Sequence, residues 1–345
     1  MGTRRKFIKS SIITSAVMYS FPNISFSKQT RLNSGLIGHG DFKYEADPKW
    51  GIQDVGKIPV KDCHEMVQDA RGRLILLTNH TKNNVIIYDK SGKVISTWGA
   101  EFPGAHGLTL WSAGEEEFLF ITDTDLHQVY KTTLDGKILM TLEYPRETGK
   151  YENAAQYKPT ETAIGPNGDI YVADGYGSNF IIQYSPKGEY IRHFGGTGKG
   201  VDEFNCCHGI TVDTRFDDPT LLITSRTSQE FKRFSMDGEH LETISLPGCW
   251  VCRPVIHGDH LYFAVIVTKS WDEYDGMIAV LDKNNKVVSF PGGKAPDYSS
   301  GELSTGISDT STFRNPHDVC IDDDENIYVP QWNSGKSYPV KLNRV

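Results

Sequence analysis

A unit of short, alternating apolar runs recurs along the chain. Its clearest copy spans 158–195, where turn sequences at 166–169 and 185–188 and a glycine-rich stretch separate three such runs. Runs with a period of two between turn residues predict consecutive antiparallel strands. A unit of about 40–50 residues with about four strands is typical of a β-propeller blade. Few folds other than a propeller can accommodate such a repeat.

Units related to this copy follow one another from residue 63 to the end of the chain. They span 63–99, 105–142, 158–195, 207–246, 251–290 and 316 onward. The last unit has only three strand-like runs, whereas 42–51 resembles an isolated outer strand. Pairing that strand with the last unit closes the ring and removes two open sheet edges. We therefore predict an all-β fold, a six-bladed β-propeller of NHL-repeat type over 42–345, with a Gly/Ser-rich insertion at 291–313 covering one face.

Composition narrows the class of protein. A chain of 345 residues with 38% hydrophobic residues and no long helical periodicity favours one large all-β domain. Its net charge of −8 argues against nucleic acid or an anionic membrane as partner. No run of about 20 apolar residues is present to span a bilayer. We expect a monomer.

The first 28 residues differ in character from the rest. The pair Arg4-Arg5, followed by Lys6 and Phe7, precedes a modest apolar run at 12–21. This arrangement resembles a twin-arginine export signal and predicts a periplasmic or extracellular protein, with 29–41 as a linker. The alternative is an ordinary basic start before a weak helix. Cleavage or retention of the segment stays open.

One residue of each unit lies at the start of its innermost strand, beside the central channel. In chain order these six residues are His64, His106, Thr160, His208, Cys252 and His317. Four histidines in this column is a large excess for a chain with 11 histidines. Side chains from different blades converge at the axis, and neutral imidazole is a common ligand of zinc that also suits iron. We predict a metal site, against the alternative of single histidines bound to channel water.

Several sequence motifs are more specific than the general pattern of NHL repeats. They lie at 106–108, 126–131, 171–176, 183–188 and 316–319. In these motifs the chain resembles the lyase domain of the peptidylglycine-amidating enzymes, a six-bladed propeller that cleaves peptidyl-α-hydroxyglycine to a peptide amide and glyoxylate. The resemblance covers most of 60–343 and is weakest across 251–290.

The resemblance implies a catalytic zinc site. His106, His208 and His317 match three zinc ligands that leave a fourth position open for substrate or water. His64 stands where that family has no ligand. As a fourth ligand, His64 would close the site and favour a structural or redox metal.

Further residues are implied by the same resemblance. Tyr176 matches an active-site tyrosine that takes the proton of the substrate hydroxyl, which requires that zinc and Arg226 lower its pKa. Arg226 matches an active-site arginine that binds a carboxylate or oxyanion. Asp318 matches a calcium ligand, together with backbone carbonyls near Met66 and Leu108.

Two positions depart from that family. Asn79 stands where a second active-site arginine is expected, and Gly177 where a half-cystine is expected. The cysteines leave three readings open: a disulfide such as Cys249–Cys252 or Cys207–Cys252, buried free thiols, or a thiolate ligand of the metal.

The sequence therefore predicts an exported, metal-dependent enzyme with lyase-like chemistry on a small-molecule or peptide substrate. The alternative is a non-catalytic NHL propeller that binds a protein or glycan. A third reading is a calcium-dependent lactonase, which needs axial carboxylates, and Glu65, Glu161 and Asp318 lie one position beyond the axial column.

Overall fold

The structure is a computed structural model that describes residues 35–271, 273–309 and 312–345. The twin-arginine segment at 1–28 lies outside the described residues. Apart from three short 3-10 turns, the regular elements are strands, as predicted. Within the described ranges, no helix has the length and apolarity that crossing a bilayer requires.

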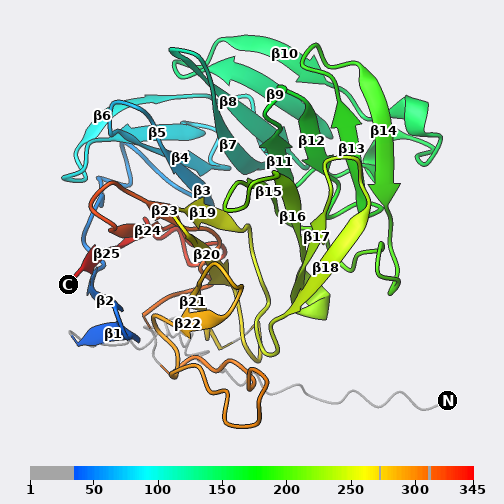
Figure 1. Cartoon of the computed structure of the whole chain (residues 1–345). Coiled ribbons are helices and arrows are strands. Elements are labelled where there is room, and N and C mark those ends of the chain that lie inside the picture. Colours follow the sequence, from blue (N-terminus) through cyan, green and yellow to red (C-terminus); the bar gives the residue numbers. More distant parts are fainter. Residues whose placement is uncertain (1–34, 272, 310–311) are drawn as a thin grey trace, which may run out of the picture. The chain divides into compact units, whose positions relative to one another are not determined.

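Six antiparallel sheets surround a common axis, which confirms the predicted six-bladed β-propeller (Figure 1). Blade 1 contains β3 (Cys63–Gln68), β4 (Leu74–Thr78), β5 (Val85–Tyr88) and β6 (Val94–Trp98). Blade 2 contains β7 (Ala105–Ala113), β8 (Glu116–Asp123), β9 (Gln128–Thr133) and β10 (Ile138–Leu142). Blade 3 contains β11 (Glu161–Ile164), β12 (Ile170–Ala173), β13 (Phe180–Tyr184) and β14 (Tyr190–Gly195).

The next two blades follow the same plan. Blade 4 contains β15 (Ile210–Asp213), β16 (Thr220–Ser225), β17 (Glu230–Phe234) and β18 (His240–Ser245). Blade 5 contains β19 (Val255–His257), β20 (His260–Val265), β21 (Met277–Leu281) and β22 (Val287–Ser289).

Blade 6 is completed by strands from both ends of the propeller domain. Its C-terminal strands are β23 (Cys320–Ile321), β24 (Ile327–Val329) and β25 (Val340–Arg344). Strand β2 (Phe42–Asp47) pairs with β25, which confirms the predicted closure of the ring. A fifth strand, β1 (Leu36–His39), pairs with β2 and lies within the stretch that we expected to be a linker.

The alternating sequence pattern places each strand between two hydrophobic layers. In β12, Tyr171 and Ala173 pack towards blade 4, whereas Ile170 and Val172 pack towards blade 2. Strands that are buried on both faces explain why inner runs read as almost wholly apolar. The hydrophobic core is thus six layers between neighbouring blades, and the axis is left to polar residues.

In blade 3 the predicted tight turn at 166–169 connects the first and second strands, and that at 185–188 connects the third and fourth. In blade 3, the amide of Gly188 donates to the carbonyl of Ser185 at 2.9 Å. Gly188 has φ 83°, a left-handed conformation that glycine adopts without steric cost.

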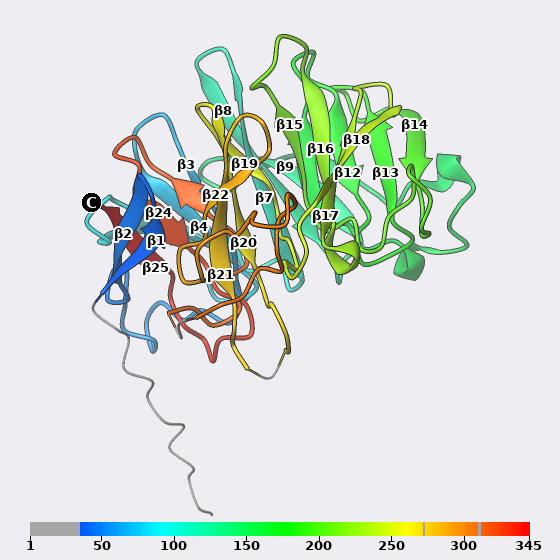
Figure 2. The ribbon, with the colours of Figure 1, turned by 60° about the horizontal axis from the view of Figure 1, so that its bottom comes forward.

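The described part of the insertion, 291–309 and 312–313, lies beside blade 5, as its orange trace shows in Figure 1 and Figure 2. The amide of Gly306 donates to the carbonyl of Pro247 at 2.8 Å, and that of Lys294 to the carbonyl of Ile307 at 2.9 Å. The described part of the insertion thus packs on the connection between blades 4 and 5.

Candidate metal centre and its cavity

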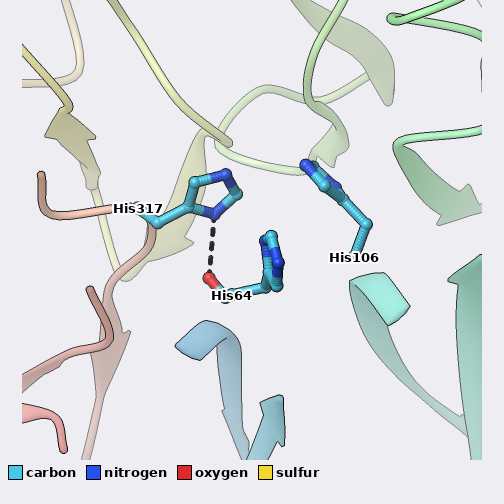
Figure 3. Close-up of side chains that lie close together, drawn as sticks. All are labelled: His64, His106 and His317. Carbon is cyan, nitrogen blue, oxygen red and sulfur yellow. Dashed lines mark hydrogen bonds between the residues drawn. The ribbon is translucent and has the colours of Figure 1, made fainter. Parts of the chain in front are cut away.

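Four buried histidines meet at the axis from four different blades. They are His64 of β3, His106 of β7, His208 just before β15 and His317 just before β23. The nitrogens of His64, His106 and His317 lie within 4.8 Å of one another (Figure 3). His208 Nε2 is 3.2 Å from His106 Nε2. The structure therefore brings together the histidines that the repeat predicted to be axial.

Backbone carbonyls determine the tautomers of two rings. Nδ1 of His106 is 2.8 Å from the carbonyl oxygen of Thr160, and Nδ1 of His317 is 2.9 Å from that of His64. A carbonyl only accepts, so each Nδ1 carries the hydrogen and each Nε2 keeps its lone pair. Metal-bound histidines are held in this way by hydrogen bonds at the nitrogen that does not bind the metal.

The remaining nitrogens also fit a cation. Among the described residues, Nδ1 of His64 and of His208 are buried without a hydrogen-bond partner. Burial lowers the pKa of all four imidazoles below its ordinary value, to about 3 for His64. The rings are therefore neutral near pH 7, the form that binds zinc or iron. His106 and His317 belong to both possible sets of three ligands. The resemblance implies His208 as the third ligand, whereas the short distances between nitrogens favour His64.

Tyr176 and Arg226 stand next to the histidines, as the resemblance implied. The Tyr176 hydroxyl is 3.2 Å from His106 Nε2 and accepts a hydrogen bond from Arg226 at 3.5 Å. Arg226 also donates to the carbonyl of Val251 at 3.1 Å and to Cys252 Sγ at 3.2 Å. Although 44% of the surface of Tyr176 is exposed, partial desolvation of its hydroxyl raises the pKa to about 12, and the nearby Arg226 only partly offsets this effect. Arg226 alone thus does not produce the lowered pKa that a base requires.

A cavity of about 540 Å³ opens over this site. Of the four histidines, His64 and His106 line it. Asn79 also lines the cavity, at the place of the missing second arginine. Lys61 of the same blade supplies a positive charge there that sequence reasoning missed.

The predicted calcium ligands bind an arginine instead. Arg253 donates to Asp318 Oδ1 at 3.1 Å and Oδ2 at 2.7 Å, to the Leu108 carbonyl at 3.0 Å and to the Met66 carbonyl at 3.3 Å. A guanidinium thus occupies the position that we assigned to calcium. The calcium prediction was wrong for this structure because a buried cation of the chain itself already satisfies these oxygens.

The same Arg253 guanidinium explains why buried carboxylates lie next to the axis. Glu65 Oε2 is 3.6 Å and Glu161 Oε2 3.7 Å from Arg253. Because these carboxylates surround an arginine, they do not support the lactonase reading. A signal for this arrangement was present in the sequence, since Glu65, Glu161, Arg253 and Asp318 all follow an axial residue directly. At Gly209, which occupies the same position in blade 4, a Cβ atom would lie 2.6 Å from the Cα of Arg253.

The cysteines do not form disulfides. All six are unpaired, and five of them are buried. Cys249–Cys252 and Cys207–Cys252, the pairs that we considered, are therefore absent. Cys252 packs against Arg226, and burial raises the pKa of its thiol to about 11. Of the three interpretations of the cysteines, the structure supports buried free thiols.

Comparisons with known proteins agree with the fold and with part of the resemblance. A family model described as a 6-bladed beta-propeller (DUF5128) matches residues 165–326. The solved "Streptogramin B lyase structure" covers 83% of this chain and 94% of its own with a TM-score of 0.55 at 14% identity, which shows the fold alone.

Two curated relatives bear on the family. Peptidyl-alpha-hydroxyglycine alpha-amidating lyase 1 of Drosophila melanogaster is 39% identical over 109 residues, 30% of this chain and 19% of its own. The probable peptidyl-alpha-hydroxyglycine alpha-amidating lyase pgal-1 of Caenorhabditis elegans is 24% identical over 268 residues, 75% of this chain and 70% of its own. The match thus spans about a fifth of the Drosophila protein. The chain is a six-bladed β-propeller with modest sequence homology to the peptidyl-alpha-hydroxyglycine alpha-amidating lyases.

Proposed function

We propose that this protein is an exported, metal-dependent lyase that cleaves the carbon–nitrogen bond of a peptidyl-α-hydroxyglycine-like substrate. The observation that carries the proposal is the convergence of four buried, neutral imidazoles, two of which line a cavity, with Tyr176 and Arg226 beside them. Homology to amidating lyases supplies the substrate class.

The histidines would hold a zinc or iron ion. A divalent ion polarises a bound hydroxyl or carbonyl oxygen and lowers the pKa of hydroxyl groups next to it. His106 and His317 are the strongest candidates, because hydrogen bonds at Nδ1 hold each ring in the tautomer whose Nε2 carries no hydrogen. Either His208 or His64 would complete a set of three ligands.

The other residues bind the substrate and handle its protons. Arg226 and Lys61 give the cavity positive charge that suits the substrate carboxylate. The reaction removes a proton from the substrate hydroxyl and delivers one to the leaving amide nitrogen, which yields a peptide amide and glyoxylate. The Tyr176 phenol is neutral near pH 7, so it suits donation to the nitrogen. The base role implied by the resemblance requires the additional positive charge of a metal ion.

Elemental analysis and a glyoxylate assay on the purified full chain test the proposal. We expect about one zinc or iron ion per chain and glyoxylate formation from an N-acylated dipeptide that ends in α-hydroxyglycine. The variants His106→Ala and His317→Ala should lose both metal and activity. The ligand set follows from the other two histidines: loss of metal in His208→Ala but not in His64→Ala identifies the open three-histidine site.

Two results would contradict the proposal. One is metal that remains in a His106→Ala, His317→Ala double variant. The other is a metal-replete protein that forms no glyoxylate, which would favour a propeller that only binds a partner. Export is tested separately: replacing Arg4 and Arg5 by lysine should abolish export of the full chain, because twin-arginine signals depend on that pair.

A further inference from the structure

Three of the six tryptophans line one side of the cavity over the histidines. Trp250 and Trp271 belong to blade 5 and Trp332 to blade 6. We call these three residues the tryptophan wall. Blades 1, 2 and 4 supply the charged lining groups, which are Lys61, Asp125 and Arg226. The cavity therefore has aromatic lining from blades 5 and 6 and polar lining, which includes His64 and His106, from the other blades.

The wall has a defined geometry. The rings of Trp250 and Trp271 have centroids 5.4 Å apart at 86°, and those of Trp271 and Trp332 are 6.0 Å apart at 80°. These are edge-to-face contacts, a favourable arrangement of aromatic rings. Trp271 thus stands between the two other rings while 41% of its surface stays exposed.

Two of the rings have rigid supports. The amide of Trp250 donates to the carbonyl of Val267 at 3.3 Å, and its carbonyl accepts from Ile266 at 3.0 Å. The amide of Trp332 donates to the carbonyl of Asn315 at 3.0 Å. Both rings also pack on the hydrophobic layer between blades 5 and 6. A preorganised aromatic surface binds an apolar group without a large loss of side-chain entropy.

We infer that the tryptophan wall selects substrates by binding a bulky aromatic side chain on the residue that precedes the reacting group. This inference rests on the proposed function for the orientation of the substrate, with its carboxylate end towards Arg226 and the histidines. A peptide in that orientation places its preceding side chain against the wall, because the wall and the histidines line the same cavity of about 540 Å³. Aromatic stacking and apolar burial would then favour phenylalanine over alanine at that position.

Calorimetric binding of two unreactive peptides, N-acetyl-Phe-Gly and N-acetyl-Ala-Gly, to the full chain tests this inference. We expect the phenylalanine peptide to bind about tenfold more tightly, and Trp271→Ala to reduce this ratio to less than about threefold. Trp271→Phe should retain most of the preference. Tyr274→Ala is the matched control, since Tyr274 is 40% exposed in the same loop but does not line the cavity, and it should keep the full ratio.

Equal affinities of the wild-type protein for both peptides, binding of neither, or an unchanged ratio in Trp271→Ala would overturn the inference. Failure of the proposed function looks different. In that case no glyoxylate forms from N-acetyl-Phe-α-hydroxyglycine, while the phenylalanine preference in binding persists and disappears with Trp271→Ala.

Discussion

Single residues next to the axis decide the chemistry of this propeller. The axial position supplies an imidazole in four of the six blades, and the next position supplies three carboxylates and Arg253. One guanidinium donates hydrogen bonds to oxygens from blades 1, 2 and 6 and lies 3.7 Å from Glu161 Oε2 of blade 3. Its loss would leave buried carboxylates without a cation, which is costly.

We predict that Arg253→Ala lowers the free energy of unfolding by about 3–5 kcal/mol. Because the vacated oxygens suit a hard cation, added calcium should raise the melting temperature of this variant. The wild-type melting temperature should not respond to added calcium. Thermal unfolding of both proteins, with exposed Arg71→Ala as control, checks this prediction. A wild-type protein stabilised by calcium would contradict it.

Tyr176 offers a second test at the level of one atom. Tyr176→Phe removes the hydroxyl that lies 3.2 Å from His106 Nε2 and keeps the ring. If this hydroxyl transfers a proton, kcat of the lyase reaction should fall by about 10²-fold. Metal content should not change, because an imidazole and not the phenol is the ligand. An unchanged kcat would remove Tyr176 from the mechanism.

At the scale of strands, pairing at blade edges and buried ion pairs determine stability. Asp213, the last residue of β15, accepts from Arg215 at 2.7 Å and from Arg233 at 2.8 Å. Burial acts to raise the pKa of Asp213, but hydrogen bonds from both arginines outweigh it and lower the pKa below its ordinary value. A carboxylate with a depressed pKa stabilises the fold above its unfolded pKa and ceases to do so as the pH falls.

The variant Asp213→Asn should therefore cost about 3 kcal/mol at pH 7, since it leaves Arg215 without its anion and Arg233 with only Glu242, at 3.2 Å. The difference from wild type should shrink as the pH falls below about 4, where this carboxylate takes up a proton in the unfolded chain, and should disappear once the pH falls below the lower pKa of the folded state. Denaturant unfolding at pH 7 and at pH 3 measures both values. A difference that does not depend on pH would show that charge is not the cause.

The closing strand is a second element whose contribution can be measured. Glu45 is exposed in β2, which lies between β1 and β25, and it pairs with Asn343. Proline at this position cannot donate a backbone hydrogen bond and removes a contact within the sheet. We expect Glu45→Pro to be destabilised by about 3 kcal/mol and to aggregate more readily, because β25 gains a partly open edge. Glu45→Ala keeps the amide and should behave like wild type; equal loss in both variants would point to the side chain.

At the scale of the whole propeller, the candidate metal would connect blades that lie near opposite ends of the sequence. His106 comes from blade 2, and His317 comes from the blade that the closing strand completes. An ion bound only by the folded state stabilises it, by about 2.7 kcal/mol at a free concentration of 100 times the dissociation constant. We expect a strong chelator of zinc and iron to lower the melting temperature of the wild-type protein. His106→Ala should start lower and not respond to the chelator, and an equal response of both proteins would place the metal elsewhere.

The sequence repeat predicts most of the fold and much of the candidate site. Blade number, ring closure and the histidine column follow from short-range patterns, because alternation and turn residues specify each strand locally and the repeat phase aligns equivalent positions. The position of Arg253 does not follow from such patterns, since a long side chain crosses the axis to oxygens of other blades. The tryptophan wall likewise comes from the end of blade 6 and from blade 5, where the repeat is most degenerate. Contacts between side chains distant in the chain depend on the closed ring, so the three-dimensional arrangement alone reveals that Arg253 contacts the carboxylates next to the axis and that the three tryptophans line the cavity.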